Sequence, residues 1–257
     1  MAKHASETGL SARTCQYARA ILRVALAQAA RWGIVSRNVA TLVEGPRVTR
    51  HEIQPLTPDQ ARALLTSIRG NRLEALVTVA VSLGLRRGEA LGLRWDALDL
   101  EGKLLHVRAS LQRVDKRWYL VEPKSARSRR TVALPDVAVS ALRTHRVRQL
   151  EERLAAGSRW RDSGFVFSTR IGTPLEPSNV TKAFKALLGR AGVPQIRFHD
   201  LRHTAATFLL AQGVDVRTIM ETLGHSQISL TLNTYSHVLP SLQRDAAQRM
   251  DAMLGGC

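Results

Sequence analysis

The first part of the chain has apolar residues at helical spacing. They begin after Ser11, a residue type that favours helix N-caps, and recur through Tyr17 and Ile21 until Gly33, which is placed to end the helix. A second, shorter helix is predicted over residues 39–43. Two helices of this size are too small for an independent hydrophobic core.

The following segment, residues 45–55, contains prolines and charges, and its apolar positions repeat with neither a helical nor a strand period. Such a composition is typical of a linker between domains. We therefore expect a partial all-α helical domain over residues 1–46, a linker over residues 47–56 and a larger domain over residues 57–257.

The larger domain begins with Thr57-Pro58-Asp59, which combines a cap residue, a proline at the first helical position and an acidic residue in the first turn. Helical periodicity continues on both sides of Gly84, then the apolar period shortens to two, and helices resume afterwards. The predicted fold class is therefore α+β, a mostly helical domain around a small antiparallel sheet. The helices are predicted over residues 72–83, 87–94, 135–155, 177–188, 199–211, 214–223, 228–235 and 240–254, and the strands over residues 98–100, 104–108, 118–122 and 130–134, with a turn at Glu101-Gly102.

Composition narrows the class of protein. The 257 residues carry a formal net charge of +17 and a sequence pI near 11.3, which favours a polyanionic partner such as nucleic acid. A general arginine bias of the source proteome is the alternative explanation. No apolar run approaches the roughly 20 residues that span a bilayer, and no signal peptide is recognised. The two cysteines form neither a disulfide framework nor a zinc cluster, so we expect a cytoplasmic protein.

Two arginines far apart in the sequence are candidates for holding one phosphate group. A guanidinium presents a rigid fork of donors that can bind two non-bridging phosphate oxygens while staying charged. Arg86 lies at a helix boundary just after Gly84, and Glu89 is placed to orient it. Arg87 is the alternative, because only the spacing from the glycine favours Arg86. The second arginine is Arg202.

His199 precedes Arg202 by three positions at a predicted helix start, so both side chains project from one face. An imidazole beside a phosphate-binding cation suits proton transfer combined with charge stabilisation. His203 points about 100° away from Arg202 in a helix and is interpreted as structural.

Two further residues near the C-terminal end complete a site for attack on a phosphodiester. His225 follows a predicted helix stop at Gly224 and can donate to a phosphate, or cap the helix instead. Tyr235 lies ten positions later (235 − 225 = 10). A phenol attacks phosphorus when neighbouring cations and a base help to remove its proton.

Lys124 lies between two predicted strands, which we interpret as a hairpin. Its ammonium can protonate the leaving 5′ oxygen, a role that suits lysine better than arginine. The alternative is a basic loop in which Lys124 joins Arg127, Arg129 and Arg130 on DNA phosphates. The two interpretations are compatible.

Together these motifs resemble the tyrosine recombinases of the phage integrase family. They occur in the family's order and cover about residues 55 to 240. The matching pieces are Gly84-x-Arg86-x-Gly88-Glu89, Pro123-Lys124 ahead of Ser128-Arg129-Arg130-Thr131, His199-Asp200-Leu201-Arg202-His203-Thr204, Leu223-Gly224-His225-Ser226 and Thr234-Tyr235-Ser236-His237.

The resemblance implies a site-specific DNA recombinase in which Tyr235 forms a 3′-phosphotyrosyl link. Arg86, Arg202, His199 and His225 would stabilise or proton-balance the transition state, and Lys124 would assist the 5′ hydroxyl. Because the covalent intermediate conserves the bond energy, neither a metal, ATP nor any other cofactor is expected.

The family resemblance also implies the partners. The first 46 residues resemble the second half of the family's helical core-binding domain, whose first half is expected to be missing here. Double-stranded DNA carrying attachment sites, a homo-tetramer on two synapsed sites and an accessory directionality factor are the expected partners. No membrane is expected, and the protein would be nucleoid-associated through DNA.

Three other functions stay open at this point. One is a catalytically idle DNA-binding remnant of an integrase, because the first half of the core-binding domain is expected to be missing. A metal-dependent nuclease would use the histidines, although no compact cluster with ligand spacing is visible. A type IB topoisomerase would use similar chemistry without sequence preference.

Overall fold

The computed structural model describes residues 9–48, 54–115, 117–122, 129–224, 247–248 and 250–254. The chain divides into two compact units, Met1–Glu52 and Ile53–Cys257. This division falls within the segment that the sequence predicts as a linker.

In the first unit, the described residues 9–48 form one long helix and a short 3-10 turn. Helix α2 (Ala12–Arg31) begins at Ser11, whose hydroxyl accepts a hydrogen bond from the Thr14 amide at 3.1 Å. The predicted second helix is only the turn η1 (Val39–Thr41), capped by Asn38. In this unit no side chain of α2 is buried, so its apolar face is exposed.

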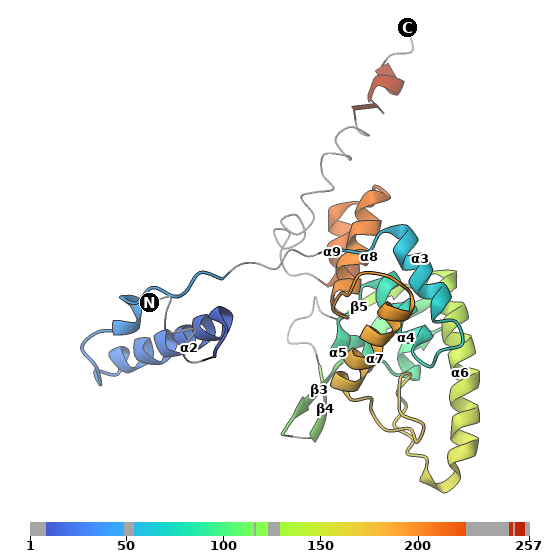
Figure 1. Cartoon of the computed structure of the whole chain (residues 1–257), viewed down its shortest axis with the longest axis horizontal. Helices are drawn as coiled ribbons and strands as arrows, with labels where there is room; N and C mark the ends of the chain where they lie inside the picture. Colours follow the sequence, from blue (N-terminus) through green and yellow to red (C-terminus); the bar gives the residue numbers. More distant parts are fainter. Residues whose placement is uncertain are drawn as a thin grey trace. The chain divides into compact units, whose positions relative to one another are not determined.

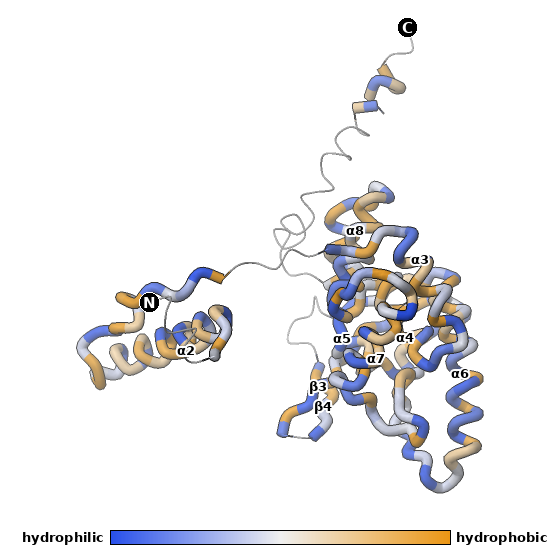
Figure 2. The backbone as a smooth tube through the Cα atoms, in the orientation of Figure 1, coloured by the Kyte–Doolittle hydropathy of each residue, from blue (hydrophilic) through white to orange (hydrophobic). Residues whose placement is uncertain are grey.

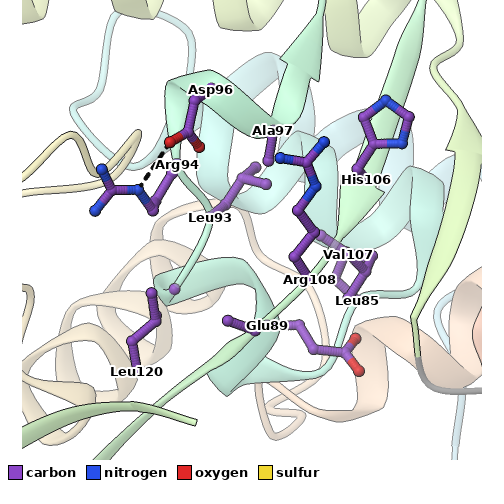
Figure 3. Close-up of a pocket in the computed structure, with 12 residues that line it drawn as sticks. Leu85, Glu89, Leu93, Arg94, Asp96, Ala97, His106, Val107, Arg108 and Leu120 are labelled. Carbon is purple, nitrogen blue, oxygen red and sulfur yellow. Dashed lines mark hydrogen bonds and ion pairs between the residues drawn. The ribbon is translucent and has the colours of Figure 1, made fainter. Parts of the chain in front are cut away.

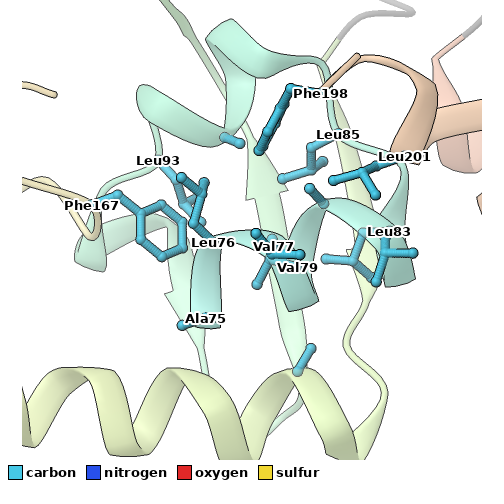
Figure 4. Packing of buried hydrophobic residues seen from close by; sticks show 14 of the residues in the cluster. Ala75, Leu76, Val77, Val79, Leu83, Leu85, Leu93, Phe167, Phe198 and Leu201 are labelled. Atoms are coloured by element: carbon cyan, nitrogen blue, oxygen red, sulfur yellow. The ribbon is translucent and has the colours of Figure 1, made fainter. Parts of the chain in front are cut away.

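The core of the second unit is built around one apolar helix. In α4 (Glu74–Leu83) nearly every side chain is buried, because its sequence is apolar on all sides. It packs against α6 (Asp136–Ala156) and α8 (Asp200–Ala211). In Figure 4, Leu76 lies beside Phe167 and Leu83 lies toward Leu201, so α4 joins core residues from distant segments.

Helix α3 (Pro58–Ser67) begins where the sequence predicts. Thr57 and Gln60 form a reciprocal capping box, and Leu64 is fully buried. The helix packs against α7 (Pro177–Arg190). In α6, hydrophilic and hydrophobic positions alternate along the helix (Figure 2), as expected where one face lies in the core.

The predicted antiparallel sheet has three strands in the order β1, β2, β5. Strand β2 (Leu104–Val107) lies between β1 (Leu98–Asp99) and β5 (Arg130–Ala133). Leu105 faces Val132 across the sheet, and both are buried against the helices. The α+β fold class is confirmed.

A separate hairpin contains a strand that the sequence analysis missed. Strand β3 (Ser110–Val114) pairs with β4 (Arg117–Val121), and only Leu111 of β3 is buried. Such an exposed strand has almost no apolar alternation to reveal it. The expectation that Lys124 lies in a hairpin turn was wrong about the pairing, because β4 pairs with β3 while β5 pairs with β2. Lys124 itself is outside the described residues.

Helices α8 and α9 (Val216–Leu223) lie side by side (Figure 1, orange), and α9 also contacts β5. Gly224 ends α9 in the left-handed conformation, as predicted. Of the two last predicted helices, the one over residues 228–235 lies outside the described residues, and the one over 240–254 is helical where it is described. Among the described helices, none is both long and apolar enough to cross a membrane.

Candidate functional site

Arg86 reaches the site from a sharp change of direction between α4 and α5 (Arg87–Leu91). Gly84 ends α4 with a φ of +63°, and Arg86 is the N-cap of α5 in an extended conformation. Its Nη1 donates to Glu89 Oε1 at 2.7 Å and its Nη2 to the carbonyl of Gly224 at 2.7 Å. The side chain is 39% exposed, so it keeps donors available to a ligand.

Arg87, the alternative candidate, points elsewhere. Its Nη1 donates to the hydroxyl of Thr181 on α7 at 3.1 Å. The structure therefore brings Arg86, and not Arg87, to the end of α9.

Arg202 approaches the same junction from α8. It is 2% exposed, and its Nη1 donates to the carbonyl of Gly84 at 2.8 Å. A methyl group on Gly84 would contact the Arg202 side chain at 3.6 Å and Leu223 of α9 at 2.3 Å. The absence of a side chain at Gly84 thus lets α8 and α9 close on the turn that carries Arg86.

Glu89 connects two guanidiniums. Besides Arg86, it accepts hydrogen bonds from Arg130 on β5 at 2.9 Å (Oε2) and 3.3 Å (Oε1). Burial alone would raise the pKa of Glu89, but the hydrogen bonds and charges of Arg130 and Arg86 outweigh it and lower the pKa. The carboxylate therefore stays ionised and holds both arginines in place.

His199 is the N-cap of α8, one turn before Arg202. Desolvation by the surrounding atoms and the charge of Arg202 lower the pKa of His199. The ring is therefore neutral near pH 7 and can accept a proton or share one in a hydrogen bond. An imidazole able to take up a proton thus lies beside the buried cation of Arg202.

His203 lies closer to this site than the sequence analysis expected. Its ring meets that of His199 edge to face, with 5.4 Å between the centroids, because residues four apart in a helix share a face. Burial and the neighbouring His199 lower the pKa of His203 to about 4.

The predicted basic segment is only partly described. Lys124 and Arg127 lie outside the described residues, as do His225 and Tyr235. Arg129 is exposed and pairs with Glu122.

Arg130 was predicted to contact DNA, but only 6% of its side chain is exposed and its guanidinium lies on Glu89. This corrects its predicted placement on a surface loop. The reason is the pairing of β5 with β2, which turns the Arg130 side chain toward α9.

A polar hollow of about 420 Å³ lies beside this cluster and is lined by His106, Arg108, Arg129 and Arg130, with Glu122 and Thr131. A more apolar pocket shares His106 and Arg108 with this hollow, and Figure 3 shows Glu89 at its edge with the carboxylate directed away from Arg94 and Asp96. Among the described residues, no group of three or more histidine, cysteine or acidic side chains is placed to hold a metal ion.

The described geometry brings the guanidiniums of Arg86, Arg130 and Arg202, the carboxylate of Glu89 and two imidazoles together near the ends of α4, α8 and α9. A family model described as the phage integrase family matches residues 54–241, which contain all of these side chains. The chain belongs to this family. The prediction from the motifs is confirmed at the level of the family.

Sequence similarity to individual proteins supports the assignment to the phage integrase family. The chain is 39% identical over 212 residues to a protein named tyrosine recombinase XerC-like from Caldanaerobacter subterraneus, covering 78% of this chain and 54% of that protein. It is 28% identical over 254 residues to the ICEBs1 integrase of Bacillus subtilis, covering 98% and 69% respectively. The chain thus spans about half the length of the first relative.

Solved structures show the same fold. The Tn1549 transposon integrase in complex with transposon right end DNA has a TM-score of 0.77 at 22% identity, covering 99% of this chain and 83% of that one. The XerA recombinase has a TM-score of 0.62 at 26% identity, covering 80% and 66%.

Sequence reasoning had no means of finding the role of Arg130. It lies in a run of basic residues typical of a solvated loop, and its partners Glu89 and Thr222 are 41 and 92 positions away. The one available signal was Glu89, a lone acidic residue in a basic segment, for which the motif analysis proposed an orienting role.

Proposed function

We propose that this chain acts as a site-specific DNA recombinase that breaks and rejoins strands through a 3′-phosphotyrosyl intermediate on Tyr235. The convergence of Arg86, which lies in the α4–α5 turn, and Arg202, which reaches this turn from α8, carries this proposal. Two guanidiniums held in this way suit a phosphate that gains negative charge on its non-bridging oxygens during attack. Membership of the phage integrase family supports the same chemistry.

In the proposed reaction, the Tyr235 oxygen forms a bond to phosphorus while the bond from phosphorus to the 5′ oxygen breaks. His199 and His225 accept or balance the phenol proton, and Lys124 gives a proton to the leaving 5′ oxygen. Arg86 and Arg202 stabilise the charge of the transition state. A 5′ hydroxyl of another strand then attacks the phosphotyrosine and releases the tyrosine, so the reaction needs neither ATP nor a redox step.

The proposed substrate is double-stranded DNA carrying attachment or recombination sites. The net charge of +17 supports binding to a polyanion, and exposed Arg129 is proposed to contact a phosphate together with Arg127. We further propose a homo-tetramer on two synapsed sites, an accessory directionality factor and a location on the nucleoid.

The test is covalent trapping. The purified chain is incubated in EDTA with nicked duplexes selected for binding from a random-sequence pool, and adducts are separated on denaturing gels, with Tyr235→Phe in parallel. We expect an EDTA-resistant protein–DNA adduct that is absent from the Tyr235→Phe lane. DNA binding without any adduct would contradict the proposed activity and support a DNA-binding protein instead, and an adduct that survives in the variant would exclude Tyr235 as the nucleophile.

A further inference from the structure

Two arginines bind the carbonyl groups at the C-terminal end of α9. The last carbonyls of a helix have no partner within the helix and need donors from elsewhere. Arg130 Nε donates to the Thr222 carbonyl at 2.6 Å, and Arg86 Nη2 donates to the Gly224 carbonyl at 2.7 Å. The end of α9 is therefore held by side chains from β5 and from the start of α5.

Both of these guanidiniums also bind Glu89. Arg130 donates from its two terminal nitrogens to the two carboxylate oxygens, and Arg86 donates from its Nη1 to Oε1. One buried carboxylate thus links the half-buried Arg86 to the buried side chain of Arg130. A change in the position of either arginine must be transmitted to the other through Glu89.

Gly224 leaves room for this arrangement. A methyl group at this position would lie 2.9 Å from Arg130 Nη1, and the residue has a φ of +70° that other residue types rarely adopt. The close approach of backbone and guanidinium therefore depends on a glycine at the end of α9.

The contact between Arg130 and the end of α9 is important because residues with proposed catalytic roles are close to it in the sequence. In the sequence His225 directly follows Gly224, the residue whose carbonyl accepts from Arg86. Arg130 also stands six positions after Lys124 (130 − 124 = 6), at the point where the chain enters β5. Arg130 thus holds the end of α9, which directly precedes His225 in the sequence, and shares Glu89 with Arg86.

We propose that Arg130 is a positioning residue for strand cleavage and not a contact to DNA. It sets the end of α9, and through Glu89 it sets the direction of Arg86. This inference rests on the proposed recombinase function. A misplacement of the order of 1 Å at a reacting group can slow a reaction about 100-fold, so loss of Arg130 should impair chemistry while leaving binding intact.

The experiment compares Arg130→Gln, Arg130→Lys and wild type for the rate of adduct formation at saturating DNA and for the salt dependence of DNA binding. The control is Arg143→Gln, which removes an exposed arginine of α6 that pairs with Glu101. We expect both Arg130 variants to form the adduct about 10- to 100-fold more slowly, with the logarithmic salt slope equal to that of Arg143→Gln. Lysine restores little because its ammonium cannot bridge a carboxylate and a carbonyl as a fork.

Two further variants separate positioning from a general loss of folding. Gly224→Ala places a methyl group against the Arg130 guanidinium. It should therefore slow adduct formation as the Arg130 variants do, although Arg130 itself is unchanged. Glu89→Gln combined with Arg130→Gln should be no slower than the slower single variant, because both act through one network. Circular dichroism confirms which variants are folded at the assay temperature.

An Arg130→Gln protein that cleaves at the wild-type rate and loses about one unit of salt slope would overturn the inference and make Arg130 a phosphate contact. The inference would also be overturned if the rate loss of the double variant equalled the product of the losses of the two single variants. If wild type forms no adduct, the recombinase proposal itself fails, and the two failures are therefore distinguishable.

Discussion

At the N-terminus of α8, the imidazole of His199 lies close to the guanidinium of Arg202, and only the guanidinium is charged. Arg202 is buried and permanently charged, and its carbonyl partner at Gly84 fixes one of its nitrogens. Burial and then the charge of Arg202 lower the pKa of His199 and favour its neutral form, which is the form that can accept a proton. In the proposed reaction, the cation that stabilises the phosphate therefore also helps to keep the neighbouring base neutral.

The first prediction concerns this pair. We expect the pKa of His199, followed by NMR of the ring C2 proton, to lie below the ordinary histidine value, and to rise in Arg202→Gln because a nearby positive charge is removed. Arg197→Gln is the control and should raise the pKa less, since Arg197 contributes less than Arg202. A His199 pKa at or above the ordinary value in wild type would contradict this account.

At the scale of elements, the site is made by helix ends and not by helix faces. The C-terminus of α4 and the C-terminus of α9 are both left-handed glycines, and both meet arginines from other elements. Helix ends expose backbone groups that side chains can bind. They also allow close packing where the terminal residue has no side chain.

The second prediction is made for α4 and α9. Gly84→Ala should lower the free energy of unfolding by about 2–5 kcal/mol, because it combines left-handed backbone strain with a clash against Leu223. Gly192→Ala is the matched control, with a φ of +65° and no atom within 4 Å, and should cost only about 1–2 kcal/mol. Urea unfolding of the two variants measures the difference, and equal losses would mean that the α4–α9 contact relaxes without cost.

At the scale of the whole molecule, the core of the second unit contains buried polar residues as well as apolar ones. His145 is buried between Trp95 and Phe167 and lies 2.7 Å from the Val166 carbonyl through Nε2. Gln149 donates a hydrogen bond to the same Val166 carbonyl and accepts one from the Trp95 indole. The neutral form of His145 is therefore part of the packing, and burial lowers its pKa.

The third prediction is a loss of stability on mild acidification. Because the pKa values of His145, His199 and His203 are lowered in the folded protein, the unfolded chain binds protons more readily below about pH 6.5. The free energy of unfolding should be constant above that pH and fall below it, by at most about 1.4 kcal/mol per pH unit for buried His145. The lowered pKa of Glu89 adds a further loss at pH values below the ordinary glutamate range.

Tryptophan fluorescence during urea unfolding at pH 7.5 and pH 5.5 measures this loss, since Trp95 lies against His145. His145→Gln keeps a donor for the Val166 carbonyl and removes one titrating ring, so its stability should depend less on pH than that of wild type. An unchanged pH dependence in this variant would show that His145 does not contribute.

Local sequence patterns determined much of this protein by themselves. The caps at Ser11 and Thr57, the glycine stops at Gly84 and Gly224 and the apolar run of α4 depend on neighbours within a few residues, so they are readable without a fold. The order of the motifs likewise identified the family, and the spacing placed His199 and Arg202 on one face.

Only the tertiary structure decided how these pieces meet. Arg130 stands among surface-type basic residues, yet β5 pairs with β2 and carries it to Glu89 and to Thr222, 41 and 92 positions away. No local pattern encodes such a partner, because a buried ion pair forms wherever the packing of distant elements brings the charges together. Whether the Arg130 side chain is exposed or buried against Glu89 is therefore decided by long-range packing.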